Sequence, residues 1–200
     1  AGLAGCEAAW QIARRGIGVV LHEMKPQKYS PAHKNADFAE LVCSNSLRSD
    51  DYLHNAVGLM HEEMRRVGSL IMQCADATKV PAGGALAVDR DGFAETVTRK
   101  LKSHPLISFI NEEITALPAA EDGSFIIASG PLTSEALIAS ILKEVNAQAL
   151  NFYDAIAPVV YKESINFDKA WYQSRYDKGD KFDYINCPLT QEEYLSLIHI

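Results

Sequence analysis

The sequence predicts a Rossmann-like α/β fold, on the basis of three features near its start. Small apolar residues recur at helical spacing from Leu3 to Ala13, and Gly16 follows where such a helix would end. The apolar run 18–22 comes next and is typical of a strand. Glu23 ends this run and follows Gly5 by roughly the twenty residues that separate a glycine-rich turn from the ribose-binding acid in dinucleotide folds.

The segment Gly2-Leu3-Ala4-Gly5 matches the second half of a GxGxxG fingerprint. Glycine at both ends of this segment lets the backbone approach a pyrophosphate and lets the helix pack closely on a strand. The first glycine and the first strand would then precede Ala1, so we expect a fold that is truncated at its N-terminus. Close packing without any phosphate explains the glycine pair equally well.

The acid at the end of the predicted strand indicates the kind of dinucleotide. A carboxylate accepts hydrogen bonds from ribose hydroxyls and repels a 2′-phosphate, so Glu23 favours FAD or NAD over NADP. A solvated strand end is the alternative explanation of Glu23.

The rest of the chain alternates between helical and strand patterns. Apolar spacing predicts an amphipathic helix over 55–74 and further helices over 89–103 and 134–146, and apolar runs predict strands over 106–110, 113–117 and 125–128. Gly83 and Gly84 separate two apolar runs, and Gly130 directly follows the last strand. Glycines at such positions allow the backbone to turn tightly or to approach a flat ligand, and a plain turn suits the Gly83-Gly84 pair equally well.

A change of composition near residue 150 predicts a second domain. We assign 1–150 to the truncated first domain, 151–194 to its end and the start of an inserted domain, and 195–200 to a non-native tail. Thr190 and Glu193 form a capping box for a new helix. Arg, Lys and Tyr alternate within 171–181 and could stack on nucleic-acid bases, although a solvated hairpin is the simpler interpretation.

Composition narrows the class of protein. Acidic side chains outnumber basic ones by 26 to 19, so the surface as a whole would repel nucleic acid, and any RNA contact requires a local basic patch. The four cysteines show neither metal-ligand nor disulfide spacing, and they favour a reduced, cytoplasmic protein. No apolar run reaches the roughly 18 residues that a bilayer span requires, so we expect no membrane partner.

Six blocks of sequence carry a family resemblance. In chain order they are GLAGCEAAWQIARRG, PAHKNADFAELVCSNSLRS, VPAGGALAVDRDGFA, SGPLTSE, FYDAIAPVV and SRYDKGD. Together they closely resemble the FAD- and folate-dependent tRNA (uracil-5-)-methyltransferases, from Ala1 to about Tyr194. The related FAD-dependent tRNA uridine-modifying proteins of the glucose-inhibited-division type share the fold and the glycines, but we find no match in them to ELVCSNSLRS or SRYDKGD.

The resemblance implies a reductive methylation of tRNA. FAD is reduced by NAD(P)H, takes a one-carbon unit from 5,10-methylenetetrahydrofolate and delivers it to C5 of a T-loop uridine, forming ribothymidine. C5 of uracil becomes nucleophilic only when a nucleophile adds at C6, and it must later lose its proton to a base. Family members use two cysteines for these steps, and Cys43 matches one of them. The other would lie beyond this chain, so Cys187 is not its counterpart.

The same resemblance assigns the remaining candidate residues, none of them to a metal. Gly2, Leu3, Ala4, Gly5 and Glu23 would hold the adenosine diphosphate of FAD, and candidates near the flavin are Asn45, Arg48, Gly83, Gly84 and Gly130. A guanidinium near Cys43 would favour its thiolate. We expect the parent protein to be active and this fragment to be inactive and poorly stable alone. The alternatives are the sister uridine-modifying flavoprotein and a non-catalytic tRNA-binding module with a flavin fold.

Overall fold

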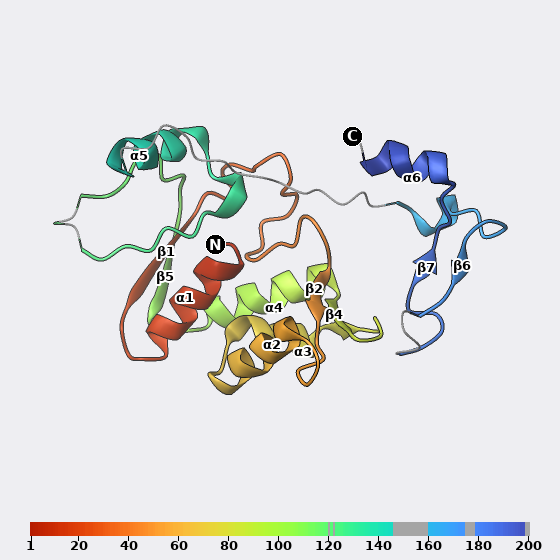
Figure 1. The fold of residues 1–200 in the computed structure, drawn as a ribbon. Helices are drawn as coiled ribbons and strands as arrows, with labels where there is room; N and C mark the ends of the chain where they lie inside the picture. The colour runs from red at the N-terminus through yellow and green to blue at the C-terminus, as the bar shows by residue number, and fades with distance from the viewer. Residues whose placement is uncertain (120, 122, 146–159, 175–178, 199–200) are drawn as a thin grey trace.

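The computed structural model describes residues 1–119, 121, 123–145, 160–174 and 179–198. Helix α1 (Leu3–Ala13) leads into strand β1 (Val19–Glu23), which pairs in parallel with β5 (Ile107–Asn111). Glu23 lies opposite Asn111, so both strands end at the same edge. Figure 1 shows this pair beside α1. The arrangement confirms the predicted α/β class with parallel strands.

A second, antiparallel sheet has the order β2–β4–β3. Its strands are β2 (Ser46–Ser49), β3 (Lys79–Val80) and β4 (Ala85–Val88), and the β2–β4 register is irregular between Ser46 and Ser49. These strands are short, and β2 is rich in serine, so their sequence carries little of the apolar alternation that predicts a strand.

The single helix predicted over 55–74 is wrong, because the structure has two helices there. Helix α2 (Ala56–Arg66) ends before Gly68, which adopts a left-handed backbone with φ +71°, and α3 (Leu70–Ala77) begins after Ser69. The Ser69 side chain caps α3 by accepting a hydrogen bond from Met72 N. The break turns α3 into the core, while Val67 at the end of α2 is 63% exposed.

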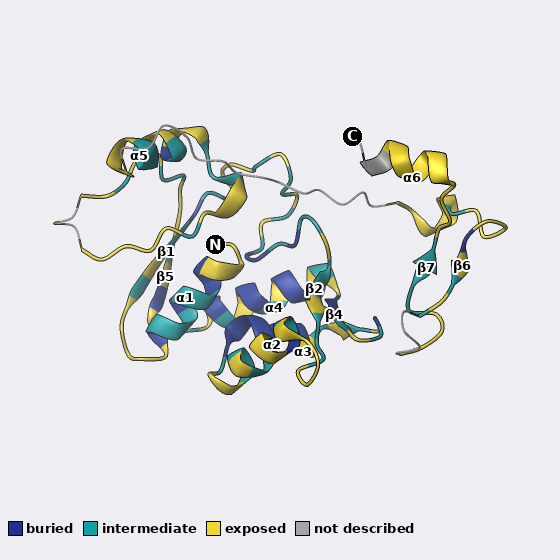
Figure 2. Cartoon of the chain, in the orientation of Figure 1, coloured by how far each residue is buried: buried dark blue, intermediate teal, exposed yellow. Residues whose placement is uncertain are grey.

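The predicted helix over 89–103 is confirmed as α4 (Arg90–Lys102), with the Asp89 side chain as its N-cap. The core lies where α1, α3, α4 and β4 meet (Figure 2). Its largest fully buried apolar side chains are Leu70, Met72, Leu86, Val88, Phe93, Val97 and Leu101. No helix among the described residues combines the length and apolar character that a membrane span requires.

Two predicted strands are wrong. Residues 113–117 and 125–128 have no strand structure, and Phe125, Ile126 and Ile127 are each about half exposed or more. A strand requires a neighbour to complete its ladder of hydrogen bonds. In the described part of the chain, no strand pairs with either segment. The helix predicted after them is confirmed as α5 (Glu135–Val145), and residue 146 lies outside the described residues.

Residues 160–198 form a C-terminal module. It contains a one-turn helix (Lys162–Ser164), the hairpin of β6 (Trp171–Tyr172) and β7 (Ile185–Asn186), and α6 (Gln191–Ile198). The hairpin agrees with the simpler interpretation of 171–181, of which 175–178 lie outside the described residues. The predicted domain boundaries, and the foreign origin of the tail 195–200, stay predictions.

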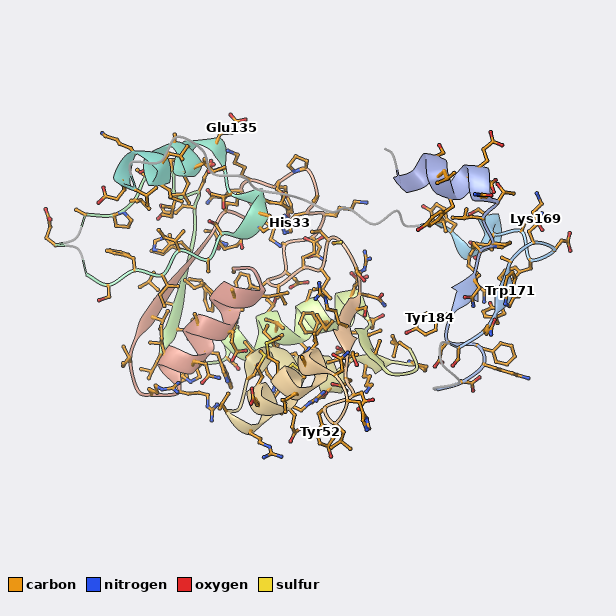
Figure 3. The ribbon with its side chains drawn as sticks, viewed as in Figure 1. His33, Tyr52, Glu135, Lys169, Trp171 and Tyr184 are labelled. Atoms are coloured by element: carbon orange, nitrogen blue, oxygen red, sulfur yellow. The ribbon has the colours of Figure 1, made fainter. Side chains whose placement is uncertain are left out.

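The predicted capping box at the start of α6 is confirmed. Thr190 N donates to Glu193 Oε2 at 2.8 Å, and Glu193 N donates back to Thr190 Oγ1 at 3.2 Å. The module also contacts the rest of the chain, since the Tyr184 hydroxyl donates to Ala82 O at 2.7 Å. Figure 3 shows Tyr184 at the side of the hairpin that faces the β3–β4 turn.

Candidate cofactor site

The predicted ribose-binding acid lies at the amino end of α1. Glu23 is only 8% exposed, and its Oε2 lies 2.6 Å from the amino nitrogen of Ala1. Its Oε1 accepts a hydrogen bond from Lys25 N at 2.9 Å. Burial raises the pKa of Glu23, but the ammonium of Ala1 and these hydrogen bonds outweigh it and hold the pKa below its usual value. The group is therefore a carboxylate at neutral pH.

The first turn of α1 is open to an anion. Gly2 is the N-cap residue, and its helix has no side-chain cap. A Cβ added at Gly2 would meet nothing within 4 Å, and one at Gly5 would make only an ordinary contact, 3.5 Å from Ala128 Cβ. Helix N–H groups without a capping side chain are the groups that bind phosphates in dinucleotide folds.

The remaining fingerprint residues and one further candidate glycine lie at the same end of α1. Leu3 and Ala4 are exposed on its first turn. Gly130 follows Ala128 by two residues, which span at most about 7 Å, so it lies close to Gly5. It has φ +70° and open space where a Cβ would stand. The structure thus brings the two fingerprint glycines, Glu23 and Gly130 together.

Cys43 belongs to the segment 34–45, which we call the cysteine loop. Ala39 N donates to Ala1 O at 2.9 Å, so the loop passes the start of α1. Asn45 exchanges two hydrogen bonds with Val88: its Nδ2 donates to Val88 O at 3.1 Å, and its O accepts from Val88 N at 2.9 Å. Cys43 lies between these two anchors, half-buried, and its distance from Ala39 is at most about 14 Å along an extended chain.

Three of the residues predicted near the flavin lie on the antiparallel sheet instead of at α1. Arg48 is exposed, with φ +73°. Gly83 N donates to Asp183 Oδ2 of the C-terminal module at 2.5 Å, and Gly84 O accepts from Asp50 N at 2.9 Å. Both glycines line an open pocket of about 320 Å³ together with Asp50, Asp51 and Lys79. This pocket is built from polar groups of the sheet and its turns.

The four thiols differ in environment. Cys6 and Cys74 are fully buried, and burial raises their pKa values to about 12 and about 11. Such thiols are poor nucleophiles at neutral pH. Cys187 is exposed on the C-terminal module, and Cys43 alone lies in the cysteine loop.

Sequence reasoning missed three charged or titratable groups around this loop. Lys25 is buried, Glu40 contacts it, and His33 Nδ1 lies 2.6 Å from Ser30 Oγ. Burial, followed by the nearby Lys25 charge, lowers the pKa of His33. The position of Lys25, two residues after the acid that ends the predicted strand, was the signal that could have found it. The polar stretch 31–49 has no periodicity, so nothing in it singled out His33 or Glu40.

Fold and site together define the class of protein. It is a mixed α/β protein in which the cysteine loop passes a helix start with two glycines, beside the acid that ends a strand. Residues 1–199 match the family described as glucose inhibited division protein A, and the chain belongs to this family.

Curated relatives with the printed name methylenetetrahydrofolate–tRNA-(uracil-5-)-methyltransferase TrmFO are similar along nearly the whole chain. The protein of Rhodospirillum rubrum is 64% identical over 96% of this chain, and that of Geobacter sulfurreducens is 63% identical over 96%. The protein of Nitrobacter winogradskyi is 58% identical over 99%. The chain spans only 40%, 44% and 42% of these three relatives, respectively.

Proposed function

We propose that these residues belong to a folate- and FAD-dependent tRNA (uracil-5-)-methyltransferase that forms ribothymidine from a T-loop uridine. The names and the high identity of the relatives support this activity. The observation that carries it is the convergence of Glu23, the open start of α1 and the loop of Cys43. The loop that carries the thiol then passes the cofactor end of α1, as expected where a one-carbon unit is transferred to uracil.

The residues at α1 suit the adenosine diphosphate part of FAD. A carboxylate has about four lone-pair positions, of which Ala1 and Lys25 use two on Glu23, so acceptors remain for ribose hydroxyls. The uncapped N–H groups of α1 would receive the pyrophosphate. Gly2 is exposed and a Cβ there would meet nothing within 4 Å, so approach of a ligand is the better reason for this glycine, whereas Gly5 is buried and packs against Ala128. The finer description of the fold is therefore a Rossmann-like FAD-binding domain.

Cys43 is the residue that we assign to the uracil. A thiolate there can add to C6 of the base or remove the proton from C5, and whichever task Cys43 does not perform would fall to another group. FAD, when bound, would supply the reduction that turns a methylene unit into a methyl group, with NAD(P)H as the reductant and 5,10-methylenetetrahydrofolate as the carbon donor. Asn45, through its bonds to Val88, holds the far end of the cysteine loop.

The test is a chimaera in which this chain replaces the segment that it matches in the Rhodospirillum rubrum protein. The chimaera should form ribothymidine in unmodified tRNA when FAD, NAD(P)H and methylenetetrahydrofolate are supplied. Cys43→Ala should reduce the yield at least about a hundredfold, the scale of losing a covalent or acid–base catalyst. Cys187→Ala is the control and should leave the yield unchanged. An undiminished yield from Cys43→Ala would favour a non-catalytic, tRNA-binding role for this domain.

The family description favours one second candidate, the sister class of FAD-dependent uridine-modifying proteins. Mass analysis of nucleosides from tRNA treated with the chimaera separates the two. A methyl group at C5 identifies the methyltransferase, and any other uridine product identifies the sister class.

A further inference from the structure

Lys25 occupies an unusual position for a lysine. It lies two residues after the end of β1 and is only 3% exposed, although burying an ammonium is costly unless it is paired. Its backbone is held on both sides: Lys25 N donates to Glu23 Oε1 at 2.9 Å, and Lys25 O accepts from Asn111 Nδ2 at 2.5 Å. The residue is therefore fixed to the ends of both parallel strands.

The Lys25 side chain extends from this fixed point into the cysteine loop. Its Nζ donates to Asp37 O and lies 3.4 Å from Glu40 Oε2. The Glu40 side chain is 11% exposed, and its Oε1 accepts from Lys34 N at 2.9 Å. The loop is thus folded around a buried ammonium, with Glu40 as the counter-charge.

Two more anchors fix the same part of the loop. Phe38 N donates to Thr98 Oγ1 at 2.8 Å, and the Phe38 ring stacks on Phe109 of β5 with centroids 5.3 Å apart. These contacts hold the backbone near residue 38, but they carry no charge. The ion pair between Lys25 and Glu40, in contrast, holds a residue that is only three positions before Cys43.

We propose that Lys25 and Glu40 are positioning residues that hold Cys43 next to the nucleotide end of the site. One connection between Glu23 and Cys43 then runs through the Lys25 backbone and the Lys25–Glu40 ion pair, and Cys43 follows Glu40 by three residues. That this positioning matters for catalysis rests on the proposed function. That Lys25 and Glu40 anchor the cysteine loop does not depend on it.

Removing the ammonium should release the loop. In Lys25→Met the aliphatic stem still fills its space, but the Glu40 carboxylate loses its counter-charge in a poorly solvated place and will turn towards water. Glu40→Gln keeps one acceptor oxygen for the loop N–H groups, removes the charge and replaces the other acceptor by an NH2 donor. Lys28→Met is the matched control, because Lys28 lies on the same connection and pairs with Glu113 at 2.7 Å on the surface.

Alkylation of individual thiols measures the release directly. In a Cys187→Ser background of this chain, iodoacetamide should modify Cys43 about fivefold faster or more in Lys25→Met, about twofold faster in Glu40→Gln, and at an unchanged rate in Lys28→Met. Cys6 and Cys74 report the core and should stay protected in all three. A rate for Cys43 that does not change, or that rises only together with those of Cys6 and Cys74, overturns the proposal. If Lys25→Met does not fold, Glu40→Gln decides by the same criterion.

The chimaera separates positioning from cofactor binding. There, Lys25→Met should lower kcat about tenfold or more while the Kd for FAD stays within about threefold, because the backbone N–H that meets Glu23 is retained. A loss of FAD affinity with unchanged kcat would contradict a role in positioning Cys43. If the Cys43→Ala chimaera still methylates tRNA at the full yield, the assignment of Cys43 to the uracil fails, and the alkylation result alone decides on the anchoring.

Discussion

The carboxylate of Glu23 and the amino nitrogen of Ala1 lie 2.6 Å apart, where β1 ends and α1 begins. A strand and the helix before it therefore deliver an acid and a set of free N–H groups to one place. In dinucleotide folds the acid meets a ribose and the N–H groups meet a pyrophosphate. The two kinds of group that a dinucleotide would meet thus lie at the same end of α1.

Glu23→Gln should weaken binding of FAD by about tenfold, since a hydrogen bond to a charged acceptor contributes roughly 1.5–3 kcal/mol. Titration of flavin fluorescence in the chimaera measures the effect. Glu112→Gln is the matched control, because Glu112 follows β5 as an exposed partner of His22 and should bind FAD normally when substituted. Equal affinities for the two variants would remove Glu23 from the site.

The sequence pattern within each segment was sufficient to predict three of the elements. The helix before Gly16 has apolar residues at helical spacing, the strand that ends in Glu23 is an apolar run, and α4 has Asp89 as its N-cap. The break at Gly68 was missed because apolar residues recur at helical spacing on both sides of it. The local signals for it are Gly68, which ends α2, and Ser69, which is the N-cap of α3.

Asp50 should make the stability of the chain sensitive to acid. It accepts from Arg65 at 2.8 Å and from Lys79 at 3.1 Å. Burial raises its pKa, but these bonds outweigh burial and lower it below its usual value. A lowered pKa means that the stabilisation is present above the unfolded pKa of about 4 and is lost as pH falls through the folded pKa.

Asp50→Asn should therefore lower the free energy of unfolding at pH 7, and the gap to the wild type should narrow from about pH 5 towards pH 3. Urea unfolding at several pH values measures this gap. Asp168→Asn, at an exposed position of the C-terminal module, should behave like the wild type throughout. A gap for Asp50→Asn that is constant with pH would contradict the linkage.

The site was only partly predictable because several of its parts come from different elements. Cys43 and the glycines lie in recognisable blocks, whereas Lys25 and Glu40 meet only after the cysteine loop folds back onto β1. The prediction of a strand over 125–128 was wrong for a related reason. Its residues are apolar enough, but a strand forms only where a neighbour supplies a ladder, and the sequence of one segment does not report its neighbours.

Glu7 should be a major stabilising link between α1 and α3. Its Oε2 accepts from Ser69 Oγ at 2.7 Å and from Ile71 N at 3.0 Å, at the positively polarised start of α3. Glu7→Ala leaves both donors without this partner and should cost about 2 kcal/mol in the free energy of unfolding. Glu62→Ala removes an exposed pair with Arg66 and should cost less than about 0.5 kcal/mol. Similar losses for the two variants would show that Glu7 does not link the helices.

Gly58 gives the sharpest test of how α2 sits in the fold. Replacing a helical glycine by alanine normally stabilises a helix by about 1 kcal/mol. At Gly58 the added Cβ would stand 2.4 Å from the backbone C and O of Asp51, which cannot rotate away. We therefore expect Gly58→Ala to lower the free energy of unfolding by about 1–3 kcal/mol, as overpacking does.

A helical glycine with a flexible neighbour is the control for Gly58. In α4, a Cβ at Gly92 would meet the side chain of Asp89 at 2.8 Å, and that side chain can move. Gly92→Ala should then cost no more than the cap bond, about 1 kcal/mol, partly offset by the better helix propensity of alanine. Urea unfolding followed by circular dichroism compares the two variants. If Gly58→Ala were as stable as the wild type, the close approach of α2 to Asp51 would be wrong, and with it the placement of the Asp50 ion pairs that depend on that approach.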